Sequence, residues 1–559
     1  MGGPEVPGPP RARANAALIR LVVGHALVVI TEWASMVAVL VYAFEQGGAR
    51  ATGLASLAVL APQLVGAPVA AALAGWLPAH RLRVAGLSVQ AVGYGAAASA
   101  AAAEAPVAVV VAATVVALGA LSTLRPTGAV LLPALVRTTQ ELTRGNLWIS
   151  HAEGASALAG PLVAAALLAL GGPPAGLAGC AALAAAATVL AVVGAPSGPP
   201  ATGVDGAWRP GPVLSGAFAT MRARPWTIGI LGVVTARSAV IGFLDVLLVV
   251  LAFEELDLGS GGPGVLSALV GAGALASTFV AAAVVRRTRL APWLAVGLGL
   301  AAVGCLALAA VTALAVTVVV LPVLGLTAAL LYGLGTILLQ RSADPRVLGS
   351  LFALIELVGG VGLLIGSGLA QVLIAVGGVS VALVGLAVVL GLVLLVTGRP
   401  VWRADADADV PVVEMSVLHE LPMFAALPPM ELEAVARAAE TVPVKAGEVV
   451  IRQGEAGHRF FAVGEGAFDI VRDGEPIRVA RRGSCFGEVA LLADVARTAT
   501  VTALEDGSLL GVDRVPFLVA VTGRDASLTA AWRFVQAMPV APELPAEPVV
   551  TSIPEADAD

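Results

Sequence analysis

Twelve long apolar stretches follow one another through the first 400 residues of this 559-residue chain. A helix needs about 20 apolar residues to cross a bilayer, and each stretch has close to that length or more. Because backbone polar groups inside a bilayer must be satisfied within the protein, each stretch is predicted to be a membrane-spanning helix. The predicted spans run near residues 18–43, 52–77, 84–103, 106–133, 147–170, 174–194, 226–252, 262–285, 290–311, 313–339, 348–375 and 378–397.

The loops between the predicted spans carry their charges asymmetrically. Those after the second, fourth, sixth, eighth and tenth spans are rich in arginine, with Arg81 and Arg83 in the first of them. The loops on the other side carry Arg50 and five acidic residues, which are Glu45, Glu104, Glu254, Glu255 and Asp257. Because basic loops stay in the cytoplasm, both termini are predicted to be cytoplasmic and the chain to lie in the cell membrane.

The predicted spans divide into two sets of six around a long loop. Residues from 119, "GALSTLRPTGAVLLPALV", can be laid over residues from 325, "GLTAALLYGLGTILLQRS". Residues from 144, "RGNLWISHAEGASALAGP", match residues from 346, "RVLGSLFALIELVGGVGL", at the equivalent place in the other half. A duplication of this kind predicts an all-α membrane domain made of two six-helix bundles.

Two six-helix bundles with a central cytoplasmic loop resemble the major facilitator superfamily. The segment "RPTGAVLLPALVRTTQELTRGN" (125–146), followed by Gly160-Pro161, is similar to its drug and siderophore exporter branch. The resemblance covers about residues 15–398 and implies a secondary transporter, with export of a small organic molecule favoured. One motif departs from the family, whose loop between spans 2 and 3 usually reads Gly-x-Leu-x-Asp-Arg. Here "GWLPAHRLR" (75–83) lacks the acidic residue, so gating at this loop is expected to differ.

Charged residues inside the predicted spans are costly, so they mark either function or buried pairs. In the superfamily, spans 1, 4, 7 and 10 line the central cavity. In this chain, the corresponding spans 1 and 10 contain the polar residues His25, Thr336 and Gln340. Glu153 and Glu356, on spans 5 and 11, are candidate counterparts in the two halves. The candidate residues for the transport cavity and proton coupling are Glu32, Arg125, Arg237, Asp245, Tyr332, Glu153 and Glu356. The alternative is that each charge only satisfies another in the packed bundle.

The character of the chain changes after Val401. The run "RADADADVPVVE" is acidic and predicts a linker, and the following residues predict two short amphipathic helices. From Val444, short β-type runs are separated every few residues by glycine turns, which indicates a small antiparallel roll. Helical sequence then returns, and the acidic tail is predicted to be disordered.

The motif "FGEVALLADVARTATV" (486–501) carries a recognisable chemistry, because Glu488 is followed nine residues later by Arg497. The guanidinium of Arg497 can bind two oxygens of a phosphate at once. Backbone N–H groups near Gly487 to Ala490 can hold the same anion. The carboxylate of Glu488 is suited to accept from a ribose hydroxyl, and Thr498 can bond phosphate or base.

The second part resembles the cyclic-nucleotide-binding domain over about residues 415–535, and the motif resembles that family's phosphate-binding cassette. The resemblance implies a regulatory ligand, with cyclic AMP favoured and cyclic GMP open. The implied binding residues are Phe486, Gly487, Glu488, Val489, Ala490, Arg497, Thr498 and Ala499. Trp532 and Phe534 are candidates for a base cap, with helix packing as their alternative. A roll that has lost its ligand is the alternative for the whole pocket.

These patterns give seven predicted segments. They are a cytoplasmic N-terminal segment (1–15), an N-terminal bundle (16–195), a central loop (196–225), a C-terminal bundle (226–398), a linker (399–414), the α+β nucleotide domain (415–537) and a disordered tail (538–559).

Charge and motifs exclude several function classes. Residues 1–400 carry a net charge of +6 and residues 401–559 carry −12, which argues against nucleic-acid binding. We find no metal-ligand spacing, no cofactor motif and no catalytic constellation, so the chain is not expected to be an enzyme. The leading hypothesis is a proton-coupled transporter regulated by a cyclic nucleotide. The alternatives are a non-transporting membrane-anchored receptor and a constitutive exporter with a vestigial domain, and the sequence indicates neither substrate nor oligomeric state.

Overall fold

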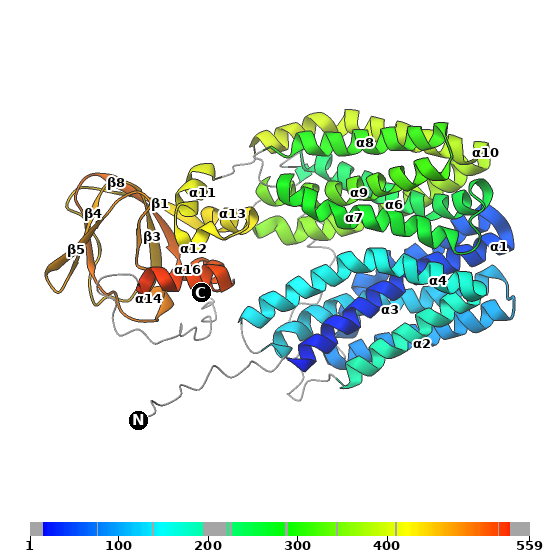
Figure 1. Ribbon diagram of the computed structural model, residues 1–559, viewed down its shortest axis with the longest axis horizontal. Coiled ribbons are helices and arrows are strands. Elements are labelled where there is room, and N and C mark those ends of the chain that lie inside the picture. The colour runs from blue at the N-terminus through cyan, green and yellow to red at the C-terminus, as the bar shows by residue number, and fades with distance from the viewer. Residues whose placement is uncertain are drawn as a thin grey trace, which may run out of the picture. The chain divides into compact units, whose positions relative to one another are not determined.

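The computed structural model describes residues 15–74, 77–136, 139–193, 221–222, 226–284, 289–342, 345–407, 411–523 and 525–536. Most of the predicted N-terminal segment, most of the central loop and the predicted tail lie outside these residues. The chain forms two compact units, one of Met1–Arg137 with Arg144–Ala408 and one of Thr138–Thr143 with Asp409–Asp559. The first holds the long apolar helices and the second holds the β-strands (Figure 1).

The helices of the first unit follow the apolar stretches of the sequence. They are α1 (Ala16–Ala74), α2 (Ala79–Ala102), α3 (Val107–Leu135), α4 (Thr139–Val193), α6 (Thr227–Val250), the π-helical turn η1 (Leu251–Glu255), α7 (Gly262–Val284), α8 (Ala291–Ala310), α9 (Leu314–Ser342) and α10 (Pro345–Asp407). Within the described residues, seven helical stretches are long and apolar enough to cross a membrane.

Three of these helices are interrupted by a pair of glycines. The pairs are Gly47-Gly48 in α1, Gly171-Gly172 in α4 and Gly377-Gly378 in α10. In each pair the second residue has a positive φ, between 59° and 74°, which glycine adopts without steric cost. The pairs lie where the first and second, fifth and sixth, and eleventh and twelfth predicted spans meet. When the three helices are divided at these glycine pairs, the helices follow the order of the predicted spans. That all twelve spans cross the membrane stays a prediction.

Specific contacts between the two halves lie near these glycine turns. The rings of Phe44 and Phe253 stack with their centroids 4.7 Å apart. The hydroxyl of Ser56 donates to that of Ser367 at 3.1 Å, which joins α1 to α10. The Gln371 amide donates to the carbonyl of Arg50 at 3.2 Å. These three contacts therefore join the two halves in the part of the unit that carries the glycine turns.

The last helix of this unit is longer than predicted. The sequence suggests that it stops before a linker at 399, but α10 continues through Asp407. Val401 and Ala404 are buried in the core of the second half, and Asp405 is only 2% exposed. The Asp405 carboxylate accepts the backbone N–H of Leu290 at 2.9 Å and that of Ala291 at 3.1 Å. It therefore caps the first turn of α8, which an acidic composition alone does not reveal.

We expect Asp405→Ala to destabilise the full-length protein by about 1–3 kcal/mol, because it leaves buried N–H groups of α8 without an acceptor. Asp405→Asn keeps one oxygen at the same place and should cost less. Thermal unfolding in detergent measures both variants against the parent. Equal stability of all three proteins would show that the cap contributes nothing.

The second unit begins with three short helices, one more than predicted. They are α11 (Val412–His419), α12 (Pro422–Ala425) and α13 (Pro429–Ala438). The strands are β1 (Ala439–Val444), β2 (Val449–Ile451), β3 (Arg459–Glu465), β4 (Phe468–Arg472), β5 (Glu475–Ala480), β6 (Cys485–Phe486), β7 (Thr500–Ala503) and β8 (Gly507–Asp513). Helix α14 (Glu488–Leu492) lies between β6 and β7, and α15 (Arg514–Thr522) and α16 (Asp525–Gln536) follow the roll.

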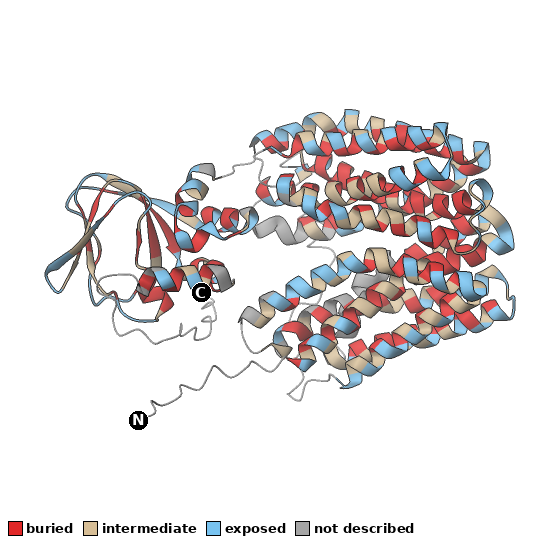
Figure 2. Ribbon diagram, viewed as in Figure 1, coloured by how far each residue is buried: buried red, intermediate tan, exposed pale blue. Residues whose placement is uncertain are grey.

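The strands form two antiparallel four-stranded sheets, in the orders β1-β8-β3-β6 and β2-β7-β4-β5. Successive side chains of a strand point to opposite faces of the sheet. On β3 this places Phe460 in a core with the helices and Phe461 in a core inside the roll. Figure 2 shows buried residues on both the strands and the helices that cover them. The predicted α+β roll is confirmed, and its two cores fix the position of β6 and α14.

Candidate functional site

The predicted phosphate-binding motif forms a turn and a short helix. Strand β6 ends at Phe486, and α14 begins at Glu488. Between them, Gly487 is in the left-handed region with φ 89°. A Cβ atom at this position would lie 2.5 Å from Nη1 of Arg497. Glycine is therefore required twice, for the backbone conformation and for the close approach of the guanidinium.

Arg497 is held under this turn. Its side chain is buried, and it donates from Nη1 to the Gly487 carbonyl at 3.1 Å and from Nη2 to the Arg459 carbonyl at 2.7 Å. A guanidinium has five N–H donors, so these two bonds orient it and leave donors for a ligand. Burial lowers the pKa of the Arg497 guanidinium, while Glu488 and Glu455 act in the opposite direction. Among the described residues no carboxylate lies within ion-pairing distance of it.

Glu488 is the second charged group of the site. It is only 1% exposed, and its Oε2 has no hydrogen-bond partner among the described residues. Burial raises the pKa of its carboxyl, and a hydrogen bond to its own backbone and the charges of Arg478 and Arg497 act in the opposite direction. A buried acceptor without a donor is costly, and such atoms are rare in folded proteins. This oxygen is therefore suited to accept a hydrogen bond from a hydroxyl group of a ligand.

The other residues of the motif pack around these two. Phe486 lies against Phe461 and Phe468 in the roll, with ring centroids 5.7 and 5.8 Å apart. Val489 and Ala490 are buried in α14, and Thr498 and Ala499 are half-buried. The motif residues predicted from the sequence, Phe486 to Ala490 and Arg497 to Ala499, therefore lie in one continuous turn-helix-loop segment.

Three further residues of the site come from elsewhere in the chain. A Cβ atom at Gly457 would lie 3.0 Å from Nε of Arg497, so this glycine also gives the guanidinium its space. Arg459 supplies the carbonyl that Nη2 bonds. Arg478 donates to the carbonyl of Cys485 at 2.7 Å. Of these three, only Gly457 belongs to a pattern that the sequence shows, the glycines that separate the β-type runs, because a cross-strand partner leaves no local pattern.

The candidate base caps have different outcomes. The side chain of Phe534 lies outside the described residues. Trp532 is 8% exposed and belongs to the core that also contains Phe460 and Phe517. The position of Trp532 thus agrees with the alternative interpretation, in which its side chain only packs α16 against the roll.

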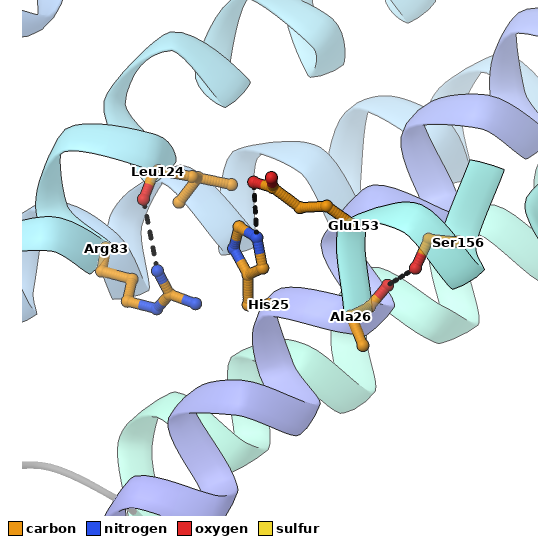
Figure 3. A network of polar contacts seen from close by, with 6 residues as sticks. All are labelled: His25, Ala26, Arg83, Leu124, Glu153 and Ser156. Atoms are coloured by element: carbon orange, nitrogen blue, oxygen red, sulfur yellow. Dashed lines mark hydrogen bonds and ion pairs between the residues drawn. The ribbon is translucent and has the colours of Figure 1, made fainter. Parts of the chain in front are cut away.

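In the first unit, one polar pair joins α1 to α4. The Nε2 of His25 lies 3.1 Å from Oε1 of Glu153, as Figure 3 shows. His25 is buried, whereas the Glu153 side chain is 51% exposed. Close by in sequence, the Ser156 hydroxyl donates to the carbonyl of Ala26 at 3.5 Å.

A second polar group joins α6, α9 and α10. The guanidinium carbon of Arg237 lies 5.0 Å from the ring centroid of Tyr332, a cation–π contact. The Tyr332 hydroxyl donates to Oε1 of Glu356 at 3.1 Å. Glu153 and Glu356 thus each bond a ring-bearing residue of another helix, and their equivalence in the two halves stays a prediction.

The remaining candidates of the first unit lie on α1, α3, α6 and α9. Glu32 in α1 and Asp245 in α6 are half-buried. The side chain of Arg125 lies outside the described residues. Thr336 donates to the carbonyl of Tyr332 on its own helix. The structure therefore brings together Arg237, Tyr332 and Glu356, and pairs Glu153 with His25.

Comparison with known families gives two matches. Residues 21–367 match the Major Facilitator Superfamily, and residues 441–521 match the cyclic nucleotide-binding domain. The family match to residues 21–367 spans more than half of the chain.

The curated relatives match the second part of the chain. A cGMP-dependent protein kinase of Eimeria tenella is 36% identical over 116 residues, which are 21% of this chain and 12% of the relative. A cAMP-dependent protein kinase regulatory subunit of Schizosaccharomyces pombe is 35% identical over 103 residues, which are 18% of this chain and 25% of the relative. The chain thus spans a quarter or less of the length of these relatives.

A solved structure of the regulatory domain of Toxoplasma gondii PKA with cAMP is 27% identical, with a TM-score of 0.21. The match covers 22% of this chain and 49% of that one.

Proposed function

Because the chain belongs to the Major Facilitator Superfamily and carries a C-terminal cyclic nucleotide-binding domain, we propose that it is a transporter regulated by a cyclic nucleotide. It is a multi-pass membrane protein, and neither part belongs to a catalytic family. In this proposal the nucleotide domain and both termini are cytoplasmic, and the substrate is a small organic molecule that leaves the cell in exchange for protons. The regulatory ligand is cyclic AMP in preference to cyclic GMP.

Two buried charged groups in the roll, which form no ion pair with each other among the described residues, support the regulatory part of the proposal. Arg497 is 7% exposed and Glu488 is 1% exposed, and burying such groups costs free energy unless they are paired. A cyclic nucleotide offers one phosphate anion and one ribose hydroxyl, which match the donors of Arg497 and the free oxygen of Glu488. A roll that had lost its ligand would gain stability by replacing both groups with apolar residues. Their retention therefore favours a working pocket over a vestigial one.

Calorimetry on the purified full-length protein tests the ligand. We expect saturable binding of cyclic AMP at a single site per chain, with weaker binding of cyclic GMP. The relatives include a cGMP-dependent protein kinase and a regulatory subunit of a cAMP-dependent protein kinase, so the experiment uses both nucleotides. Absence of heat with either nucleotide would refute the regulatory proposal.

We expect Gly487→Ala to weaken binding of cyclic AMP by about tenfold or more. The new methyl group would meet Nη1 of Arg497 at 2.5 Å, and a left-handed alanine costs about 1–2 kcal/mol. Gly474→Ala is the matched control, because Gly474 has φ 84° and no atom within 4 Å of the added Cβ. Equal affinities in the two variants would mean that only backbone strain matters, not the position of Arg497.

Transport is supported by the polar groups kept within the apolar helices. A membrane anchor has no use for the group of Arg237, Tyr332 and Glu356, and polar groups in a bilayer are costly. These contacts therefore favour a transporter over a receptor that uses its helices only as an anchor.

We expect Glu32→Gln or Asp245→Asn to abolish the dependence of transport on a proton gradient, because an amide cannot carry the proton. Efflux of an amphipathic dye from proteoliposomes with imposed pH gradients measures this. Glu254→Gln, an exposed carboxylate in η1, is the control. If both test variants keep their pH dependence, coupling lies elsewhere, with Glu153 and Glu356 as the next candidates.

A further inference from the structure

A buried arginine in the first half has no acidic partner among the described residues. Arg83 was predicted in a loop, but it lies in the first turns of α2 and is 4% exposed. Its one hydrogen bond among the described residues runs from Nη1 to the carbonyl of Leu124, at 3.3 Å (Figure 3). No carboxylate of the described residues lies within ion-pairing distance of it. A buried cation with a single neutral acceptor is costly, so the site calls for an anion.

Two glycines give this guanidinium its space. A Cβ atom at Gly128 would lie 3.3 Å from Nη1 of Arg83, and one at Gly24 would lie 4.0 Å from Nη2. Arg83 therefore lies between α1 and α3, where larger residues would crowd it. Most of its five N–H donors remain for another acceptor.

A small cavity opens beside this side chain. Its lining includes Arg20, Gly24, His80, Arg83, Leu131 and Leu190, from α1, α2, α3 and the second part of α4. Arg20 and His80 are half-buried, so three basic side chains line the cavity, and no acidic residue of the described chain does. Helix α2 begins at Ala79 without a side-chain cap, so the amides of its first turn add to the positive potential.

We propose that this cavity binds an oxyanion of the phosphate type, through Arg83 with Arg20 and His80. Arginine binds two oxygens of such a group in parallel, which a single chloride cannot offer. The source is either free inorganic phosphate or the phosphate of an anionic lipid headgroup, because the chemistry is the same. The site is separate from the β-roll and does not depend on the proposed regulation.

The sequence explains why the anion must come from outside. In "GWLPAHRLR", Ala79 occupies the place of the acidic residue that was expected in this loop. A residue four positions before Arg83 on the same helix lies on the same face and could pair with it. Alanine at this place provides no carboxylate for Arg83, and no other described residue provides one.

The test uses full-length protein with Arg497→Ala, so that the β-roll cannot respond to phosphate, in nanodiscs of phosphatidylcholine. A ligand that binds only the folded state raises the melting temperature in a saturable way. We expect sodium phosphate to do so relative to sodium chloride of equal ionic strength. Arg83→Gln should weaken the phosphate response at least tenfold. Arg81→Gln, an exposed arginine on the same helix, should leave it unchanged.

Further measurements distinguish free phosphate from a lipid headgroup and provide variants in case Arg83→Gln misfolds. The anion is assigned to a lipid headgroup if nanodiscs of phosphatidylglycerol raise the melting temperature of the parent but not that of Arg83→Gln. Sodium phosphate should then have no effect on the parent in phosphatidylcholine. Ala79→Asp should stabilise the protein without ligand and remove the response. If Arg83→Gln does not fold, Arg20→Gln and His80→Gln at the half-buried lining should each weaken the response. Equal responses in Arg83→Gln and Arg81→Gln, or no response to either ligand, would overturn the proposal.

Discussion

Replacing Arg497 by alanine is expected to weaken binding of cyclic AMP to the full-length chain by about 30-fold to several thousand-fold. This corresponds to about 2–5 kcal/mol, the usual cost of removing one partner from a buried, hydrogen-bonded charge pair. The guanidinium is fixed by the carbonyls of Gly487 and Arg459, so it meets the phosphate without a further loss of side-chain entropy. Calorimetry with the parent and the variant measures the difference.

Two matched variants separate the phosphate contact from a general effect of charge. Arg482→Ala also removes an arginine from the roll, but its partner is the exposed Glu420, so we expect affinity close to that of the parent. Arg497→Lys keeps the charge and loses the paired donors, so its affinity should lie between the other two. An unchanged affinity in Arg497→Ala would remove the pocket from consideration.

The pocket was predictable to the extent that it is local. Glu488, Gly487 and Arg497 belong to one short segment, and their spacing predicts the groups that the structure brings together in the turn after β6. Gly457 and Arg478 contribute from β-strand turns and neighbouring strands, and no spacing in the sequence specifies that registry. The position of Trp532 depends on how α16 packs against Phe460 and Phe517, so the sequence left it open.

The membrane part shows the same division. The apolar stretches predict the order of the helices, and the boundary between the predicted spans 348–375 and 378–397 coincides with the break at Gly377-Gly378. Pairs such as His25 with Glu153 depend on the rotation of one helix against another, which hydropathy does not encode. The run "RADADAD" has the composition of a solvated linker, yet one of its carboxylates, that of Asp405, is buried as the cap of α8.

That buried cap fixes the end of the last long helix within the membrane part. Helix α10 ends at Asp407, and α11 begins at Val412. Arg289 also donates to the Asp405 carbonyl at 2.9 Å, so the end of α10 is fastened to the start of α8. A displacement of the end of α10 would therefore act directly on the start of α8 in the second half.

Locking the two halves together is expected to change the affinity for cyclic AMP by about 5- to 150-fold, because coupling between two sites is typically about 1–3 kcal/mol and is reciprocal. The hydroxyls of Ser56 and Ser367 are 3.1 Å apart, so Ser56→Cys with Ser367→Cys places two thiols close enough for a disulfide. Oxidation would hold the halves closed at the end that carries the glycine turns, the state seen here. Calorimetry compares the oxidised and reduced double variant.

The direction of the change identifies the state that the nucleotide favours. Tighter binding in the oxidised protein means that cyclic AMP stabilises closure at the glycine-turn end, and weaker binding means that it stabilises opening there. Each single variant, treated with the same oxidant, controls for the native Cys180, Cys305 and Cys485, which are buried. If the oxidised and reduced double variants bind cyclic AMP equally, the nucleotide site and the transport cycle are uncoupled. A constitutive exporter with an independent nucleotide domain, or a membrane-anchored receptor, then becomes the better account, because neither requires the helices to sense the ligand.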